Sequence, residues 1–99
     1  MSFDESIRER LKGYRLDGNK MTRARRQVMP VMSQEGLRSE MRRRGDRKKG
    51  LARSHISNLE NEKFDPPPKT IWAVANALGV DVMQIVRRRD NHWKEAANG

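Results

Sequence analysis

The sequence contains no cysteine and no long hydrophobic run, and each absence removes a class of protein. Without cysteine, neither a disulfide framework nor a thiolate metal site is available, and nothing points to an oxidising compartment. No run approaches the roughly 18 apolar residues of a membrane span, and residues 1–10 lack the apolar stretch of a secretory signal. We therefore expect a cytoplasmic protein.

Aromatic residues and the usual catalytic groups are also scarce. Aromatic side chains make up 5% and hydrophobic ones 34% of the 99 residues, which allows one modest core. The two histidines, His55 and His92, lack the spacing of a zinc site, so we expect no metal and no cofactor. The carboxylates are scattered over charged stretches, and no glycine-rich phosphate loop follows a strand. An enzyme is therefore not expected.

Positive charge is abundant, and it is concentrated in one third of the chain. Residues 20–53 carry twelve basic and three acidic side chains, a net charge of +9 that equals the net charge of the whole chain. A field of this kind attracts a polyphosphate backbone through steering and counterion release. A solvated basic surface, or attraction to an anionic membrane, would also account for it.

Apolar spacing predicts an all-α protein. A first helix is expected over residues 4–15, ended by the glycine and asparagine at residues 18–19. Its apolar stripe would consist of Phe3, Ile7, Leu11 and Tyr14. Thr22 would cap a short basic helix that reaches Met29, where Pro30 stops it. No segment of useful length shows the alternation of a strand.

The middle of the chain predicts two helices joined by a polar loop. Ser33 would cap a helix that runs through Arg44, residues 45–50 (GDRKKG) would form the loop, and a second helix would end near residue 61. The side chains expected to face the core are Leu37 and Met41 in the first helix and Ile56 and Leu59 in the second.

The C-terminal part predicts a buried helix and a short last one. Pro68 suits the first position of a helix that Gly79 closes, and Asp81 would cap the last helix with Gln84 completing a capping box. The inward residues would be Ile71, Val74, Ala75 and Leu78, then Val82, Ile85 and Val86. We expect one domain over residues 1–89 and a disordered tail over residues 90–99.

Several short motifs follow one another in residues 51–86, LARSHISNLENEKFDPPPKTIWAVANALGVDVMQIV. They are Ile-Ser-x-Leu-Glu-Asn, a lysine, a proline, Thr-Ile, and Val-Ala-x-Ala-Leu-Gly-Val, and upstream residues 32–37 are MSQEGL. In this order and spacing they resemble the lambda-repressor and Cro type helix-turn-helix domain, the large XRE-like family. The matched segments cover a little under half of the chain.

The resemblance implies a bundle of about five helices in which residues 52–61 form the recognition helix in the DNA major groove. The base-contacting positions would be Arg53, Ser54, Ser57 and Asn58. The phosphate-contacting side chains would be Gln34, Arg42, Arg43, Arg44, Arg47, Lys48, Lys49, Lys63 and Lys69. Arg53 could pair with a guanine and Asn58 with an adenine, whereas Glu60 would support the bundle.

The chain also departs from the family pattern. Residues 42–50, RRRGDRKKG, replace a tight turn, so either the scaffold helix runs on and the loop adds backbone contacts, or the turn geometry differs. Ala52 stands in place of the usual Ser or Thr cap, and Glu62 stands where glycine is common. Residues 7–22 resemble the first helix of the family and its turn, which would leave residues 23–32 as an insertion.

The roles of His55 and Trp72 have two interpretations each, whereas those of the methionines have one. His55 is expected to be a surface or packing residue, with DNA contact as the alternative. Trp72 would either pack under the tail or form a dimer contact. The methionines expected to fill the core are Met29, Met32 and Met41.

These observations together predict a sequence-specific, repressor-like transcriptional regulator that binds double-stranded DNA as a homodimer, on a pseudo-palindromic site with half-sites about 10 bp apart. Two alternatives stay open at this point. One is an antitoxin or adaptor whose main partner is a protein. The other is nonspecific packaging of nucleic acid, for which the localised charge alone would suffice.

Overall fold

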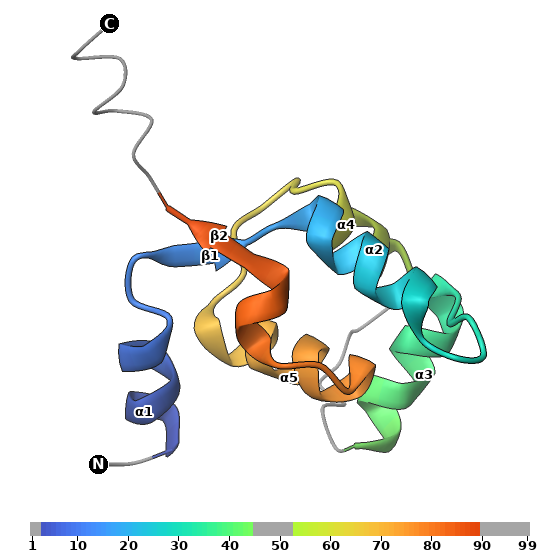
Figure 1. Ribbon diagram of the computed structural model, residues 1–99, viewed down its shortest axis with the longest axis horizontal. Helices are drawn as coiled ribbons and strands as arrows, with labels where there is room; N and C mark the ends of the chain where they lie inside the picture. Colours follow the sequence, from blue (N-terminus) through green and yellow to red (C-terminus); the bar gives the residue numbers. More distant parts are fainter. Residues whose placement is uncertain (1–2, 45–52, 90–99) are drawn as a thin grey trace, which may run out of the picture.

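A computed structural model describes residues 3–44 and 53–89, together with the backbone but not the side chain of Arg53. In the described residues five α-helices, one 3-10 helix and a two-stranded sheet follow one another along the chain (Figure 1). They are α1 Phe3–Arg10, β1 Tyr14–Leu16, α2 Gly18–Gln27, α3 Gln34–Arg43, α4 Arg53–Glu60, α5 Pro68–Leu78, the 3-10 helix η1 Val82–Ile85 and β2 Val86–Arg88. The predicted helical bundle is confirmed, and the sheet is an addition to it.

The core is built around α5, on which α1 and α3 pack from two sides (Figure 1). The four α5 residues predicted to face inward are all buried, and so are the inward residues of α3 and α4. They are Ile71, Val74, Ala75 and Leu78 in α5, Leu37 and Met41 in α3, and Ile56 and Leu59 in α4. Burying one such Ile, Leu or Met side chain stabilises the fold by about 1.5 to 3 kcal/mol.

The ends of the central helices follow the predicted signals. The Ser33 hydroxyl accepts a hydrogen bond from the Gly36 amide at 2.9 Å, Pro68 is the first residue of α5, and Gly79 closes it in the left-handed conformation. The predicted last helix is only a 3-10 turn. The Asp81 carboxylate makes no capping bond there and instead accepts from Arg10 at 2.9 Å.

The N-terminal prediction was wrong in its boundaries. α1 ends at Arg10, and Gly13, with a positive φ of 85°, turns the chain into β1. β1 then pairs antiparallel with β2, placing Tyr14 opposite Arg88. A three-residue strand whose partner lies some seventy residues away leaves no local periodicity, which is why the stripe through Tyr14 suggested a longer helix.

The residues around Gly18 begin a helix and do not end one. The Asp17 carboxylate accepts from the Lys20 amide at 2.9 Å and so caps α2, while Thr22, the predicted cap, lies inside the helix. Residues 23–27 complete α2, and the expectation that residues 23–32 form an insertion stays a prediction. Arg25, in that stretch, is buried.

The structure decides the environment of the methionines and of Trp72. Met41 is buried and Met32 packs against the core, but Met29 is 85% exposed, so its assignment to the core was wrong. The Trp72 indole contacts α1, with its ring edge-on to Phe3 at a centroid distance of 5.8 Å. Thus α1, which neither expectation named, is the partner that the structure gives this indole.

Several predictions fall outside the described residues. These concern the loop at residues 45–50 with Arg47, Lys48 and Lys49, and the tail at residues 90–99 with His92 and Trp93. Within residues 3–44 and 53–89, no helix is both long and apolar enough to cross a membrane.

Candidate nucleic-acid interface

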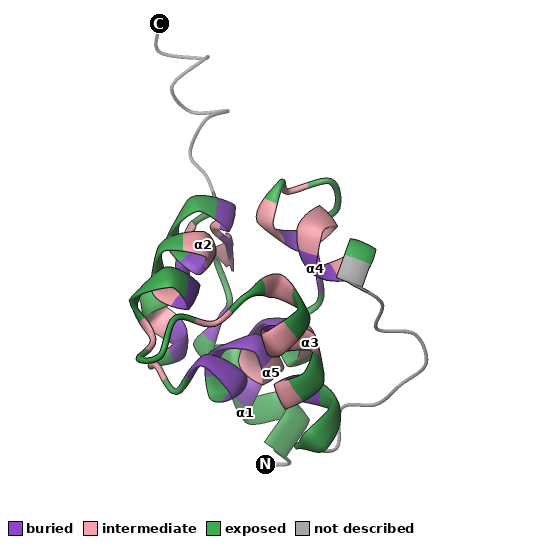
Figure 2. Ribbon diagram, turned by 90° about the vertical axis from the view of Figure 1, so that its right-hand side faces the viewer, coloured by how far each residue is buried: buried purple, intermediate pink, exposed green. Residues whose placement is uncertain are grey.

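α4 separates apolar from polar side chains in the way that a recognition helix requires. Ile56 and Leu59 are completely buried, Ser54 is exposed, and Ser57 and Asn58 are half-buried. Residues 54, 57 and 58 are spaced i, i+3 and i+4, so they share the face turned away from the core. Figure 2 shows α4 at the surface, with its buried residues toward the rest of the molecule. Base contact by these side chains, and by Arg53, stays a prediction.

Two neighbours of this ridge have partners within the protein. The Asn61 side-chain amide donates to the Ser57 carbonyl oxygen at 2.9 Å and to its hydroxyl at 3.3 Å, which steadies the last turn of α4. The His55 ring is half-buried and lies 5.3 Å from the Phe64 ring, centroid to centroid. His55 therefore packs against the connector after α4, as the first of the two expectations held.

A buried ion pair fixes α4 to α2. The Glu60 carboxylate accepts from Arg25 Nε at 2.6 Å and from Arg25 Nη2 at 3.1 Å, and the two side chains are only 6% and 10% exposed. Arg25 Nη1 also donates to the Met32 carbonyl oxygen at 2.9 Å. Burial opposes ionisation of Glu60, but the hydrogen bonds from Arg25 and Gln34 outweigh it and lower the pKa of Glu60.

Glu60 supports the bundle, as the resemblance implied, and Arg25 is the partner that the sequence did not indicate. Arg25 was counted only as one member of the basic segment. The available signal was its position four residues after Met21, which places both side chains on the buried face of α2.

Gln34 begins α3, where helix amides and the helix dipole favour a phosphate. Its side-chain amide donates to Glu60 Oε1 at 3.0 Å, so the α2–α4 ion pair also orients this residue. The phosphate contact itself stays a prediction. Through this hydrogen bond, Glu60 ties the start of α3 to the end of α4.

The arginines at the end of α3 are exposed. Glu40 accepts from Arg43 at 2.6 Å and from Arg44 at 2.7 Å, and these two hydrogen bonds lower the pKa of Glu40. The arginine side chains are 70% and 48% exposed, and exposed pairs of this kind contribute little to stability. A phosphate could therefore replace Glu40 as their partner. Arg42 is exposed and makes no ion pair with any described residue.

The two predicted phosphate-contacting lysines that follow α4 in the chain, Lys63 and Lys69, are also exposed. Lys63 follows α4, and its backbone amide donates to the Asn58 carbonyl oxygen at 2.9 Å, which holds the turn against α4. Lys69 lies in the first turn of α5. Within the described residues, the predicted phosphate contacts therefore come from the start and end of α3, the turn after α4 and the start of α5.

The comparisons with known proteins agree with this geometry. Residues 45–85 match the sequence model of a helix-turn-helix family. This part of the chain is therefore similar to a helix-turn-helix, in agreement with the resemblance that its motifs carry. Neither a curated protein nor a solved structure matched the chain. The match supports a DNA-binding role for these residues.

The match to the helix-turn-helix family leaves out α3 and both strands. It begins at residue 45, after α3, so the resemblance of residues 32–37 to the scaffold helix rests on its own motif. The structure supports that role for α3, because α3 packs against both α4 and α5. β1 and β2 both lie outside the matched residues.

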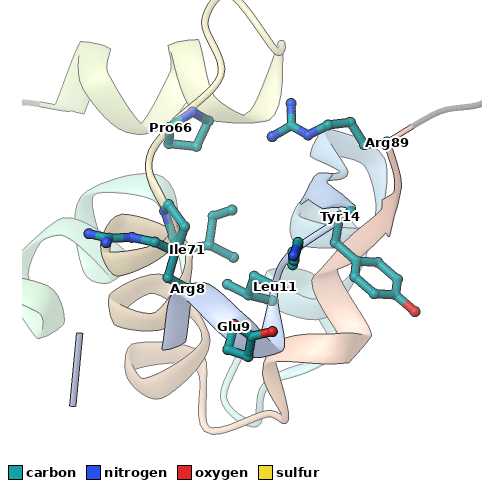
Figure 3. A pocket seen from close by; sticks show the side chains of 10 residues that line it. Arg8, Glu9, Leu11, Tyr14, Pro66, Ile71 and Arg89 are labelled. Atoms are coloured by element: carbon teal, nitrogen blue, oxygen red, sulfur yellow. The ribbon is translucent and has the colours of Figure 1, made fainter. Parts of the chain in front are cut away.

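The molecule also has a hollow of about 440 Å³ between α1, the sheet and the proline connector before α5 (Figure 3). It is lined by Arg8, Glu9, Leu11, Lys12, Gly13, Tyr14, Pro66, Pro68, Ile71 and Arg89. The lining brings together no nucleophile with a base, and no group of three His, Asp or Glu side chains able to hold a metal occurs among the residues described. No chemistry is assigned to this hollow.

Proposed function

We propose that this protein is a sequence-specific, repressor-like transcriptional regulator of the cytoplasm that reads the DNA major groove with α4. The observation that carries the proposal is the division of α4, with Ile56 and Leu59 completely buried and a polar ridge at Ser54, Ser57 and Asn58. The helix is thereby held rigidly while the side chains able to bond base edges stay on its outer side.

Roles within this interface follow from side-chain chemistry. The Asn58 amide has the donor and acceptor pair that matches adenine, and the Arg53 guanidinium matches guanine. The exposed cations on α3, after α4 and on α5 would bind phosphates, which sets register and affinity without selecting sequence. Since the strongest positive charge lies in residues 20–53, this part of the chain would face the DNA backbone.

Binding as a homodimer to a pseudo-palindromic site is part of the proposal. A helix-turn-helix that binds as a two-fold dimer presents its recognition helices to half-sites about 10 bp apart. Sedimentation of the protein with a duplex carrying one or two half-sites tests this, because a stoichiometry of two proteins on the longer site is expected.

Selection of bound duplexes from a random pool tests the function itself. An enriched motif is expected, and Asn58→Ala should then relax one base position and weaken binding to that motif by about 1 to 3 kcal/mol. Asn76→Ala is the matched control, since Asn76 is an exposed asparagine in the last turn of α5. If all duplexes bind equally well with a strong salt dependence, the protein is a nonspecific packaging factor and the proposal is wrong.

A further inference from the structure

Glu62 has an unusual backbone conformation at the end of the recognition helix. Its φ is +54°, the left-handed region that a side chain with a Cβ rarely adopts, and it is the only described residue other than glycine with a positive φ. Glycine would adopt this turn at no steric cost and is common at this position in the family that the sequence resembles. We therefore expect the Glu62 carboxylate to make contacts that offset this strain.

That carboxylate holds three elements together. Its two oxygens accept from Arg87 in β2 at 2.7 and 2.8 Å, a bidentate arrangement, and one of them accepts from the Gly18 amide at the start of α2 at 2.8 Å. Arg15 in β1 lies 3.6 Å away. The Glu62 side chain is 25% exposed, so these contacts are partly shielded from water.

Glu62 also compensates a charge repulsion within the sheet. Arg15 and Arg87 are directly opposite one another in the antiparallel pair, and like charges in that position repel. The carboxylate contacts both guanidinium groups and so compensates the repulsion. Asp17 also lies 3.7 Å from Arg87, but among the described residues Glu62 is the carboxylate that contacts both arginines, so without it their repulsion would oppose the pairing of β1 with β2.

Close backbone contact at Gly18 also joins the start of α2 to the end of α4. A Cβ at Gly18 would overlap the carbonyl oxygen of Glu60, so the start of α2 lies against the last turn of α4 with no room for a side chain. The end of α4 is thus fixed at Gly18 twice, by close backbone contact and by the hydrogen bond from the Gly18 amide to the Glu62 carboxylate.

We propose that Glu62, Arg15 and Arg87 form a brace that sets the orientation of α4 on DNA, so that the two strands outside the helix-turn-helix are part of the DNA-reading unit. The inference rests on the proposed function. Glu62 is a positioning residue in it: its carboxylate touches no base, and its effect on DNA passes through the end of α4.

Glu62→Gly and Glu62→Gln test the brace. The glycine variant keeps the turn and removes the carboxylate, and the glutamine variant keeps the size and removes the charge. Asp81→Asn is the matched control, because it neutralises a carboxylate paired to Arg10 at 2.9 Å, on a pair that does not include α4. Each protein is titrated with the selected duplex and with a scrambled duplex of equal length.

We expect both Glu62 variants to bind the selected duplex about ten-fold more weakly, while binding to the scrambled duplex changes by less than about three-fold. The control should bind both duplexes as the wild type does. Amide hydrogen exchange at residues 56–59 should be faster in the Glu62 variants and unchanged in the control, a readout that needs no DNA.

The double reversal Glu62→Arg with Arg87→Glu provides the rescue. It pairs positions 62 and 87 again and places a carboxylate opposite Arg15, but the Gly18 amide loses its acceptor and the new carboxylate lies near Asp17. Binding to the selected duplex should therefore recover in part relative to either single reversal. The brace is refuted if the wild type prefers the selected duplex and the glycine variant keeps that preference in full. A wild type without any preference overturns the proposed function and the brace with it.

Discussion

Replacing Glu60 by alanine would remove the acceptor on which α2, α3 and α4 converge. Arg25 would lose two hydrogen bonds to a carboxylate, at 2.6 and 3.1 Å, and Gln34 would lose one at 3.0 Å. Arg25 would keep only its bond to the Met32 carbonyl oxygen. With 10% of its side chain exposed, the guanidinium would then be a buried charge without a counter-charge.

The size of the effect follows from that burial. Removing one member of a buried ion pair costs about 3 to 5 kcal/mol. We take the lower end, about 3 kcal/mol, because the bond to the Met32 oxygen survives. A domain of this length has a total stability of roughly 5 to 15 kcal/mol, so the variant would lose a substantial part of it.

Urea unfolding followed by circular dichroism measures this loss. With an m-value of about 1 to 1.5 kcal/mol/M, the midpoint should fall by about 2 to 3 M. Glu60→Gln, which keeps the size and one acceptor oxygen, should cost about half as much. Asp81→Ala is the control, because its pair with Arg10 is about half exposed and should change stability by less than about 0.5 kcal/mol. A cost for Glu60→Ala as small as that of the control would refute the reasoning.

Three further outcomes are expected. Hydrogen bonds from Arg87 lower the pKa of Glu62 to about 2. The ionised Glu62 therefore stabilises the folded protein by about 1 to 2 kcal/mol after solvent screening, fully above about pH 5 and progressively less as the pH falls toward 2. Acid titration of the unfolding free energy should show a smaller loss in Glu62→Gln than in the wild type. Gly18→Ala should destabilise by about 2 kcal/mol or more because its Cβ would overlap the last carbonyl oxygen of α4, whereas Gly36→Ala, facing only movable side-chain atoms, should lie within about 1 kcal/mol of the wild type in the same urea assay. Arg42→Gln should weaken every duplex alike and lower the salt slope of binding by about 1, whereas Arg8→Gln on α1 should leave the slope unchanged.

Much of the helical framework could be predicted because its signals are local. In α5 the apolar residues Ile71, Val74 and Leu78 recur at the helical period, so one side must be buried wherever the helix lies. The Ser33 cap and the left-handed Gly79 are likewise decided within a few residues. The buried side of α4 was predictable for the same reason.

The polar contacts that position the candidate site could not be predicted in this way. A charged residue is by default solvated, so the spacing of four residues from Met21 is the one local sign that separates the buried Arg25 from its exposed neighbours Arg23 and Arg26. Its partner Glu60 lies 35 residues away, and only the packing of α2 on α4 brings the two together.

The amino-acid sequence alone therefore determined the helices, their buried faces and the helix-turn-helix, because each depends on periodicity and capping within one turn or two. Only the tertiary structure decided where α1 ends, that residues 14–16 form a strand, and why a glutamate occupies a left-handed turn at residue 62. The physical reason is that the strand pairing and the Glu62 contacts join residues 25 to 74 positions apart, and their free energy exists only once the chain has brought them together.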